Sequence, residues 1–255
     1  MLSPSRKRYF KHNSESALGE GTTWLEFTGD EPTRQVEQYG NRFFSSIVPY
    51  EPEVGGTLVD QLLPELELRI DEAIEQAEFE SVWLTAQTQY ETRKQKARDF
   101  LHYHKGDATA PTGSEPKIIA HICNDVGAWG KGFVLAISQR WKAPEEAYRG
   151  WYQKRADIAF ALGGVQIVSV DTKLWVANMI AQHGLRGTST NPPIRYEALG
   201  QCLEKLARHA LDLKSSVHMP RIGCGLAGGK WEKVEPLLLS NLCMASIHVT
   251  VYDFE

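Results

Sequence analysis

The second half of the chain alternates between short apolar runs and longer amphipathic stretches. The apolar runs, which are typical of strands buried on both faces, are KIIAHIC, GVQIVSV, LWVANMI, SVHMPRI and SIHVTVYDF. Between them lie helical patterns; in the stretch from Arg195 to Leu213, for example, Leu199, Cys202 and Leu206 recur at helical spacing. Strands that alternate with helices predict a mainly parallel or mixed α/β sheet covered on both sides, with ligands beyond the carboxyl ends of the strands.

The first half of the chain follows a different pattern. Trp24–Phe27 is typical of a short strand, RQVEQYGNRFF of a hairpin turning at Tyr39-Gly40-Asn41, and VPYEPEVGG of a loop. From Asp71 to Phe100 there is no glycine or proline, and apolar residues recur at helical spacing, so we predict one long helix. This half therefore predicts a small α+β module, and it contains no grouping of residues that demands chemistry.

Charge divides the chain at about the same place. Residues 1–100 carry 11 Lys and Arg against 18 Asp and Glu, a balance of −7, whereas residues 101–255 carry 17 against 14, a balance of +3. The N-terminal stretch MLSPSRKRYFKHNSES is basic and polar and lacks the apolar core of a secretory signal. We expect three parts: a mobile leader over 1–20, a small α+β module over 21–98, and a larger α/β unit over 99–255.

Composition excludes several classes of protein. With 42% hydrophobic residues and a net charge of −4, the chain is typical of a globular protein and not of a general polyanion binder. No run approaches the roughly 18 to 20 apolar residues of a membrane helix, so we expect no membrane partner. The four cysteines show neither C-x-x-C nor zinc-finger spacing, which predicts reduced thiols in a cytoplasmic protein, with no metal and no cofactor.

Two glycine-rich loops each join a predicted strand to a predicted helix. They are NDVGAWGKG, residues 124–132, and HMPRIGCGLAGGKW, residues 218–231. Backbone N–H groups of such a loop form an anion site at a helix N-terminus, and glycine lets a phosphate approach the main chain. One loop alone is equally well explained as a tight turn, but two at equivalent places favour a phosphate-bearing ligand. The second loop is no Walker A motif, since Trp231 replaces the magnesium-binding Ser or Thr, and its G-x-G-x-x-G match lies too near the C-terminus for a dinucleotide fold.

Five stretches follow one another over about residues 100–255: HKGDAT, IAHICNDVGAWGKGFVLAISQRW, WVANMIAQHG, MPRIGCGLAGGKWEKVEPLL and VTVYDF. In their sequence and their order they resemble the macrodomain, the ADP-ribose-binding fold. The chain resembles most the branch that contains the ADP-ribose 1″-phosphate phosphatases and a set of bacterial single-domain relatives. The resemblance implies an α/β fold with a macrodomain-like mixed sheet between helices, preceded by the small α+β module. That module resembles a short uncharacterised bacterial module, which implies no function.

The resemblance also implies a role for each matched position in binding ADP-ribose. Asp107 would accept a hydrogen bond from the adenine amino group, Tyr252 would border the adenine, and Asn124 would face the distal ribose. Both glycine loops would wrap the diphosphate. The full set expected to contact the ligand is Asp107, Ala108, Asn124, Gly130, Lys131, Gly132, Phe133, Ile222, Gly223, Cys224, Gly225, Leu226, Ala227, Gly228 and Tyr252. Turn roles for Asp107 and Asn124, and core packing for Tyr252, are the alternatives.

Two residues near the first loop are candidates for catalysis. His121 is expected to end its strand and face the distal ribose, as a histidine does in the phosphatase branch; a buried structural histidine is the alternative. Asp125 is expected to activate water, with a solvated loop aspartate as its alternative. Gln182 and Ala227 stand where a related glycohydrolase branch has a catalytic lysine and aspartate, so we do not expect that amine-dependent chemistry.

The function expected from these features is hydrolysis of an ADP-ribose derivative, either ADP-ribose 1″-phosphate or an ADP-ribosyl bond. The alternative is a non-catalytic reader of ADP-ribose or of ADP-ribosylated macromolecules, with the N-terminal module docking a protein partner. Cys224 has no neighbouring base that the sequence identifies, so we expect it to be a small packing residue of the second loop.

Overall fold

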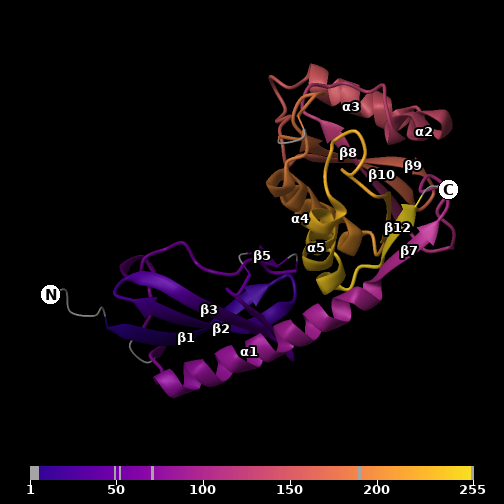
Figure 1. Cartoon of the computed structure of the whole chain (residues 1–255). Coiled ribbons are helices and arrows are strands. Elements are labelled where there is room, and N and C mark those ends of the chain that lie inside the picture. The colour runs from indigo at the N-terminus through magenta and orange to yellow at the C-terminus, as the bar shows by residue number, and fades with distance from the viewer. Residues whose placement is uncertain (1–5, 49, 52, 70–71, 189–190, 254–255) are drawn as a thin grey trace. The chain divides into compact units, whose positions relative to one another are not determined.

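The computed structural model describes residues 6–48, 50–51, 53–69, 72–188 and 191–253. The chain forms two compact units, Met1–Gln95 and Lys96–Glu255, which we call the front unit and the rear unit (Figure 1). Their boundary lies a few residues before the predicted one at residue 98. Each unit is described by itself.

The front unit is built on a four-stranded antiparallel sheet. Its strands, in spatial order, are β1 (Lys7–Ser16), β2 (Gly19–Thr28), β3 (Glu31–Tyr39) and β4 (Arg42–Ser45). A short strand pair, β5 (Tyr50–Glu51) and β6 (Gly55–Gly56), lies within the segment predicted as loop. A 3-10 turn, η1 (Leu63–Glu65), and the helix α1 (Gln76–Lys96) follow.

The prediction of a mobile leader over residues 1–20 is wrong for its described part. Lys7–Ser16 pair with Gly19–Thr28 along their whole length. Tyr9 is buried, and its ring centroid lies 5.4 Å from that of Phe79 on α1. The sequence did not predict this strand because basic and polar side chains alternate with its inward-facing positions. The segment is therefore polar in composition although one side of it is packed.

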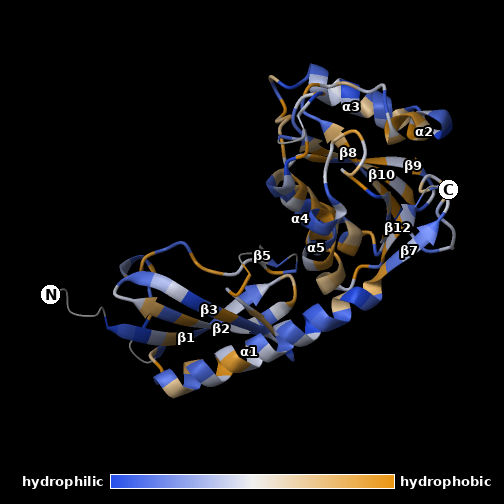
Figure 2. Ribbon diagram, viewed as in Figure 1, coloured by the Kyte–Doolittle hydropathy of each residue, from blue (hydrophilic) through white to orange (hydrophobic). Residues whose placement is uncertain are grey.

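Both faces of the front sheet are covered. Trp24 and Val36 pack with Phe79 and Ala86 of α1 on one face. Leu25 and Phe27 point to the opposite face, where residues of the 59–68 segment cover them. The C-terminal half of α1 is largely hydrophilic (Figure 2).

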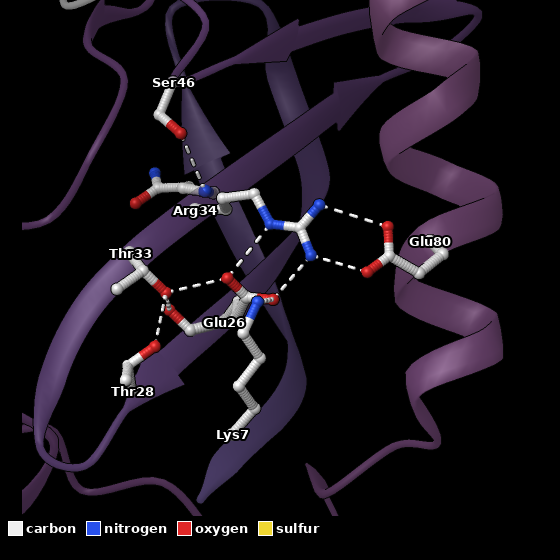
Figure 3. A network of polar contacts seen from close by, with 8 residues as sticks. Lys7, Glu26, Thr28, Thr33, Arg34, Ser46 and Glu80 are labelled. Atoms are coloured by element: carbon white, nitrogen blue, oxygen red, sulfur yellow. Dashed lines mark hydrogen bonds and ion pairs between the residues drawn. The ribbon is translucent and has the colours of Figure 1, made fainter. Parts of the chain in front are cut away.

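A network of ion pairs links α1 to this sheet (Figure 3). Arg34 on β3 donates to the two carboxylate oxygens of Glu80 at 2.6 and 3.1 Å and to Glu26 on β2 at 2.5 and 3.0 Å. Lys7 lies 3.1 Å from the Glu26 carboxylate, which is almost fully buried. Burial raises the pKa of Glu26, but hydrogen bonds from Arg34 and its neighbours outweigh that effect and lower the pKa to about 2.

The rear unit contains a six-stranded mixed sheet between helices, as predicted. Its strands, in chain order, are β7 (Leu101–Lys105), β8 (Lys117–Asn124), β9 (Val165–Asp171), β10 (Leu174–Gln182), β11 (Ser216–Pro220) and β12 (Val249–Asp253). Their spatial order is β7-β12-β11-β8-β10-β9, and every neighbouring pair is parallel except the β9–β10 hairpin. The carboxyl ends of five strands therefore lie at one edge of the sheet.

Helices cover both faces of the rear sheet (Figure 1). They are α2 (Phe133–Arg140), α3 (Ala143–Gln153), α4 (Tyr196–Asp212) and α5 (Trp231–Asn241), with the 3-10 turns η3 (Ala97–Phe100) and η4 (Cys243–Ala245). On the α2–α3 face, Ile137 and Tyr148 pack against Ile119 and Ile180. The predicted long helix ends at Lys96 and continues only as η3. No helix in the described ranges is long and apolar enough to cross a membrane.

Candidate ligand-binding site

A cleft of about 350 Å³ opens at the carboxyl ends of β7, β11 and β12. Its lining residues are Gly106, Ala108, Phe133, Pro220, Arg221, Cys224, Gly225, Tyr252 and Asp253. Five of the predicted contact residues, Ala108, Phe133, Cys224, Gly225 and Tyr252, are among them. The lining combines two aromatic side chains with residues of the second glycine loop, and Phe133 directly follows the first loop. This combination suits a ligand that has a flat ring and an anionic group.

The glycines of the second loop are present for different reasons. Gly223 has a φ of +75°, and a Cβ there would lie 2.4 Å from the Ile194 side chain, so the fold itself requires glycine. Gly225 has no positive φ, and a Cβ there would meet no protein atom within 4 Å. Gly130 in the first loop is also free of both constraints. One glycine in each loop thus leaves space that the protein does not fill.

The two glycine loops approach each other at Gly132 and Leu226. Gly132 has a φ of +79° and immediately precedes α2, and a Cβ there would lie 3.3 Å from the Leu226 side chain. Leu226 is nonetheless 67% exposed. The start of α2 and the second loop are therefore neighbouring segments of the chain.

Two predicted contact residues have their polar groups engaged within the protein. Asn124 accepts hydrogen bonds from the N–H groups of Val126 and Ala128 at 3.1 and 3.0 Å, and its amide donates to the Ala128 carbonyl at 2.6 Å. The Asp107 carboxylate accepts a hydrogen bond from the N–H of Thr109 at 2.8 Å and pairs with Arg140 at 3.0 Å. The turn roles considered as alternatives are thus observed for both residues.

Arg221 and Asp253 are cleft-lining residues that the sequence reasoning missed. The guanidinium of Arg221 binds both carboxylate oxygens of Asp253, at 2.5 and 2.9 Å. It also lies 5.2 and 4.9 Å from the ring centroids of Tyr103 and Trp231. Arg221 directly precedes Ile222, and Asp253 directly follows Tyr252, which are both predicted contact residues. Arg221 and Asp253 are distant in sequence, and the pairing of β11 with β12 brings them together.

His121 does not lie where the sequence placed it. Its strand continues to Asn124, so His121 sits within β8 and is only 2% exposed, on the face covered by α2 and α3. The Nε2 atom donates to the Asn178 side-chain oxygen at 2.7 Å, and the ring lies edge-on to Trp129. Burial lowers the pKa of His121 to about 4. The prediction that His121 ends its strand is therefore wrong, and the ring is buried, as the alternative of a structural histidine expects.

Asp125, the second catalytic candidate, is paired with a histidine that sequence reasoning did not single out. Its Oδ2 lies 2.6 Å from Nδ1 of His183, and its Oδ1 accepts the N–H of Gly184 at 2.7 Å. Burial raises the pKa of Asp125, but these hydrogen bonds and the charge of His183 lower it below its usual value. His183 is 58 positions away in sequence, and the parallel pairing of β8 with β10 brings the two residues together.

Neither a reactive thiol nor a cluster of metal-ligating side chains is found at the site in the described part of the chain. Burial raises the pKa of the Cys224 thiol more than the neighbouring Arg221 lowers it, so the thiol is protonated at neutral pH. Within the ranges that the structure describes, no group of three or more His, Cys, Asp or Glu side chains is placed to hold a metal ion.

Comparison with known proteins shows what class of domain this is. No protein-family model matches the chain. A solved structure described as a macrodomain protein from Streptomyces coelicolor is 54% identical, with a TM-score of 0.55, and the match covers 60% of this chain and 98% of that one. Because the match extends over almost the whole of that domain, the chain belongs to the macrodomain family.

Other relatives extend this comparison. A protein of unknown function from Bacteroides thetaiotaomicron is 59% identical, with a TM-score of 0.58, over 60% of this chain and 97% of that one. The ADP-ribose 1″-phosphate phosphatase of Lodderomyces elongisporus is 25% identical over 167 residues, 60% of this chain and 99% of the phosphatase. The chromodomain-helicase-DNA-binding protein 1-like of Mus musculus is 32% identical over 163 residues, and the chain spans only 18% of its length.

Proposed function

We propose that the rear unit binds ADP-ribose, free or attached to a larger molecule, in the cleft between the two glycine loops. The observation that carries this proposal is the unfilled space at Gly130 and Gly225, one in each loop, where the protein itself gives no reason for glycine. A diphosphate fits this space because it must contact main-chain N–H groups closely. The adenine would lie at the aromatic end of the cleft, beside Tyr252 and Phe133.

The side-chain charges near the cleft add little attraction for an anion, which supports binding of the diphosphate by main-chain N–H groups. Arg221 is neutralised by Asp253, so it adds little net attraction for an anion. Lys131 in the first loop is exposed, and its attraction is screened by salt. We therefore expect the affinity for ADP-ribose to depend only weakly on ionic strength and strongly on the shape of the two loops.

A substitution at Gly225 tests this proposal. Gly225→Val fills the open space with a branched side chain and is expected to weaken ADP-ribose binding by about 100-fold, roughly 2.7 kcal/mol. Gly150→Val is the matched control, because Gly150 lies in α3, away from the cleft, and also faces open space. Titration calorimetry of the full chain measures both. Equal affinities in the two variants, or no binding by the unmutated protein at millimolar ADP-ribose, would refute the proposal.

Hydrolysis of an ADP-ribose derivative is the second function that we propose. The names of the yeast relatives and the Asp125–His183 pair favour it. A reader of ADP-ribosylated macromolecules, with the front unit docking a protein partner, is the competing possibility. Turnover of ADP-ribose 1″-phosphate and of an ADP-ribosylated peptide by the full chain separates a hydrolase from a reader.

A further inference from the structure

We propose that His183, held by Asp125, is the general base that hydrolyses the bond between C1″ of the distal ribose and an oxygen-linked anionic leaving group. The leaving group would be a phosphate or the carboxylate of an acidic side chain. This inference rests on the proposed binding of ADP-ribose and assigns a reaction to the far end of the same site.

The geometry of the pair suits a general base. Because Nδ1 of His183 donates to the Asp125 carboxylate at 2.6 Å, the neutral ring carries its proton there and keeps a lone pair on Nε2. The side chain of His183 is 61% exposed, and the described part of the chain provides no hydrogen bond to Nε2. The Asp125 side chain is only 17% exposed and is also fixed by the N–H of Gly184, so it acts as a positioning residue.

The order of the loops along the sheet edge places this pair relative to the ligand. The aromatic end of the cleft lies at β7, β12 and β11, whereas Asp125 and His183 follow β8 and β10, the next two strands in the sheet. The segment after β10 also packs on the second glycine loop, since the N–H of Ile194 donates to the Ala227 carbonyl at 3.2 Å and the N–H of His183 donates to the Pro193 carbonyl at 2.8 Å. A ligand with adenine in the cleft and diphosphate along the loops points its distal ribose toward β8 and β10.

With one general base and no general acid among its described residues, the site can cleave only a bond whose leaving group departs as an anion. His183 Nε2 takes a proton from a water molecule, whose oxygen forms a bond to C1″ while the bond from C1″ to the leaving oxygen breaks. The electron pair of that bond stays on the phosphate or carboxylate, which leaves as an anion and needs no proton, and the imidazolium then releases its proton to solvent. A linkage through an arginine nitrogen needs a protonated leaving group, so this site should not cleave it.

Other groups near the loops do not serve as this base. His121 is buried on the α2–α3 face and its Nε2 donates to Asn178. Gln182 does not titrate, and its amide donates to the Gly184 carbonyl at 2.8 Å. Cys224 lines the opposite end of the site, beside Arg221.

The test measures turnover and binding on the same full-length variants. His183→Ala and His183→Gln should lower kcat for ADP-ribose 1″-phosphate and for a glutamate-linked ADP-ribosyl peptide by at least about 100-fold, with the Kd for ADP-ribose within about threefold. Asp125→Asn keeps an acceptor for Gly184 and should lower kcat by about tenfold without changing that Kd. His209→Ala, on the exposed side of α4, is the control and should match the unmutated protein. In water enriched in oxygen-18, the released phosphate should stay unlabelled.

Several results would overturn the assignment. These are full turnover in either His183 variant, a Kd that weakens in step with kcat, and labelled phosphate, which would show attack at phosphorus. If the unmutated protein binds ADP-ribose but turns over neither substrate, the inference fails and the proposed binding function stands. If it does not bind ADP-ribose at all, the proposed function itself fails.

Discussion

His121 illustrates how burial decides the role of a titratable residue. Its ring is enclosed between β8 and the α2–α3 layer, and its one strong hydrogen bond, to Asn178, requires a proton on Nε2. Protonating the second nitrogen would place an unpaired charge in an apolar environment, which explains the pKa of about 4. We therefore assign His121 to the stability of the rear unit and not to its chemistry.

This assignment predicts a pH dependence of stability. Because the pKa of His121 is lowered from 6.5 to about 4 by folding, the unfolded state binds more protons between these values, and the free energy of unfolding falls as the pH falls from 6.5 to 4. The full contribution is on the order of 3 kcal/mol. His218, whose pKa is also about 4, adds in the same direction.

Urea unfolding at a series of pH values measures this effect. His121→Gln keeps a donor for Asn178 but cannot titrate, so the slope of the unfolding free energy between pH 6.5 and 4 should decrease by about one proton, while ADP-ribose binding stays within about threefold. His209→Gln is the control and should keep the original slope. An unchanged slope in His121→Gln would show that the buried position does not control its protonation.

Much of the site could be predicted from sequence, but the purpose of individual residues could not. The motifs identified both glycine loops and five of the nine cleft-lining residues. They could not separate Gly223, which the fold requires, from Gly225, which it does not, because that distinction depends on φ and on neighbours distant in sequence. Pairing of β8 with β10 and of β11 with β12 likewise creates the Asp125–His183 and Arg221–Asp253 pairs.

At the scale of elements, the attachment of α1 to the front sheet depends on buried charge. Arg34 compensates Glu26, which is almost fully buried, and links it to Glu80 on the helix. The strand β1 contributes Lys7 to this network. The basic residues of β1, which led to the prediction of a mobile leader, thus include one that forms an ion pair with a buried carboxylate. The regular helices and the rear strands were predictable because their periodicity is strong, whereas the charged strand β1 was not.

Removing Arg34 should destabilise the front unit. Arg34→Ala leaves the Glu26 carboxylate buried with Lys7 as its remaining cationic contact, so we expect a loss of about 3 kcal/mol in unfolding free energy. Glu78→Gln is the control, since it breaks the exposed ion pair with Lys11 and should cost less than about 1 kcal/mol. Thermal unfolding followed by circular dichroism compares them. Similar melting curves for the two variants would mean that the network does not hold α1.

At the scale of the whole molecule, each unit has its own apolar core. Residues of β8, β10, α2 and α3 form one cluster in the rear unit, and the front sheet has a cluster on each face. We therefore expect a fragment of residues 96–255 to fold alone and to bind ADP-ribose with the affinity of the full chain. Circular dichroism and calorimetry on the fragment test this. An unfolded fragment would show that the rear core depends on residues 1–95.

The central claim is that the two glycine loops hold ADP-ribose, and the backbone amide signals of Gly130 and Gly225 test it most directly. In a titration of the isotopically labelled chain followed by nuclear magnetic resonance, the account predicts that these two amides are among the most strongly shifted by ADP-ribose. Amides of the front unit should stay in place. Saturable binding that leaves the signals of both glycines unchanged and shifts amides elsewhere would contradict the account.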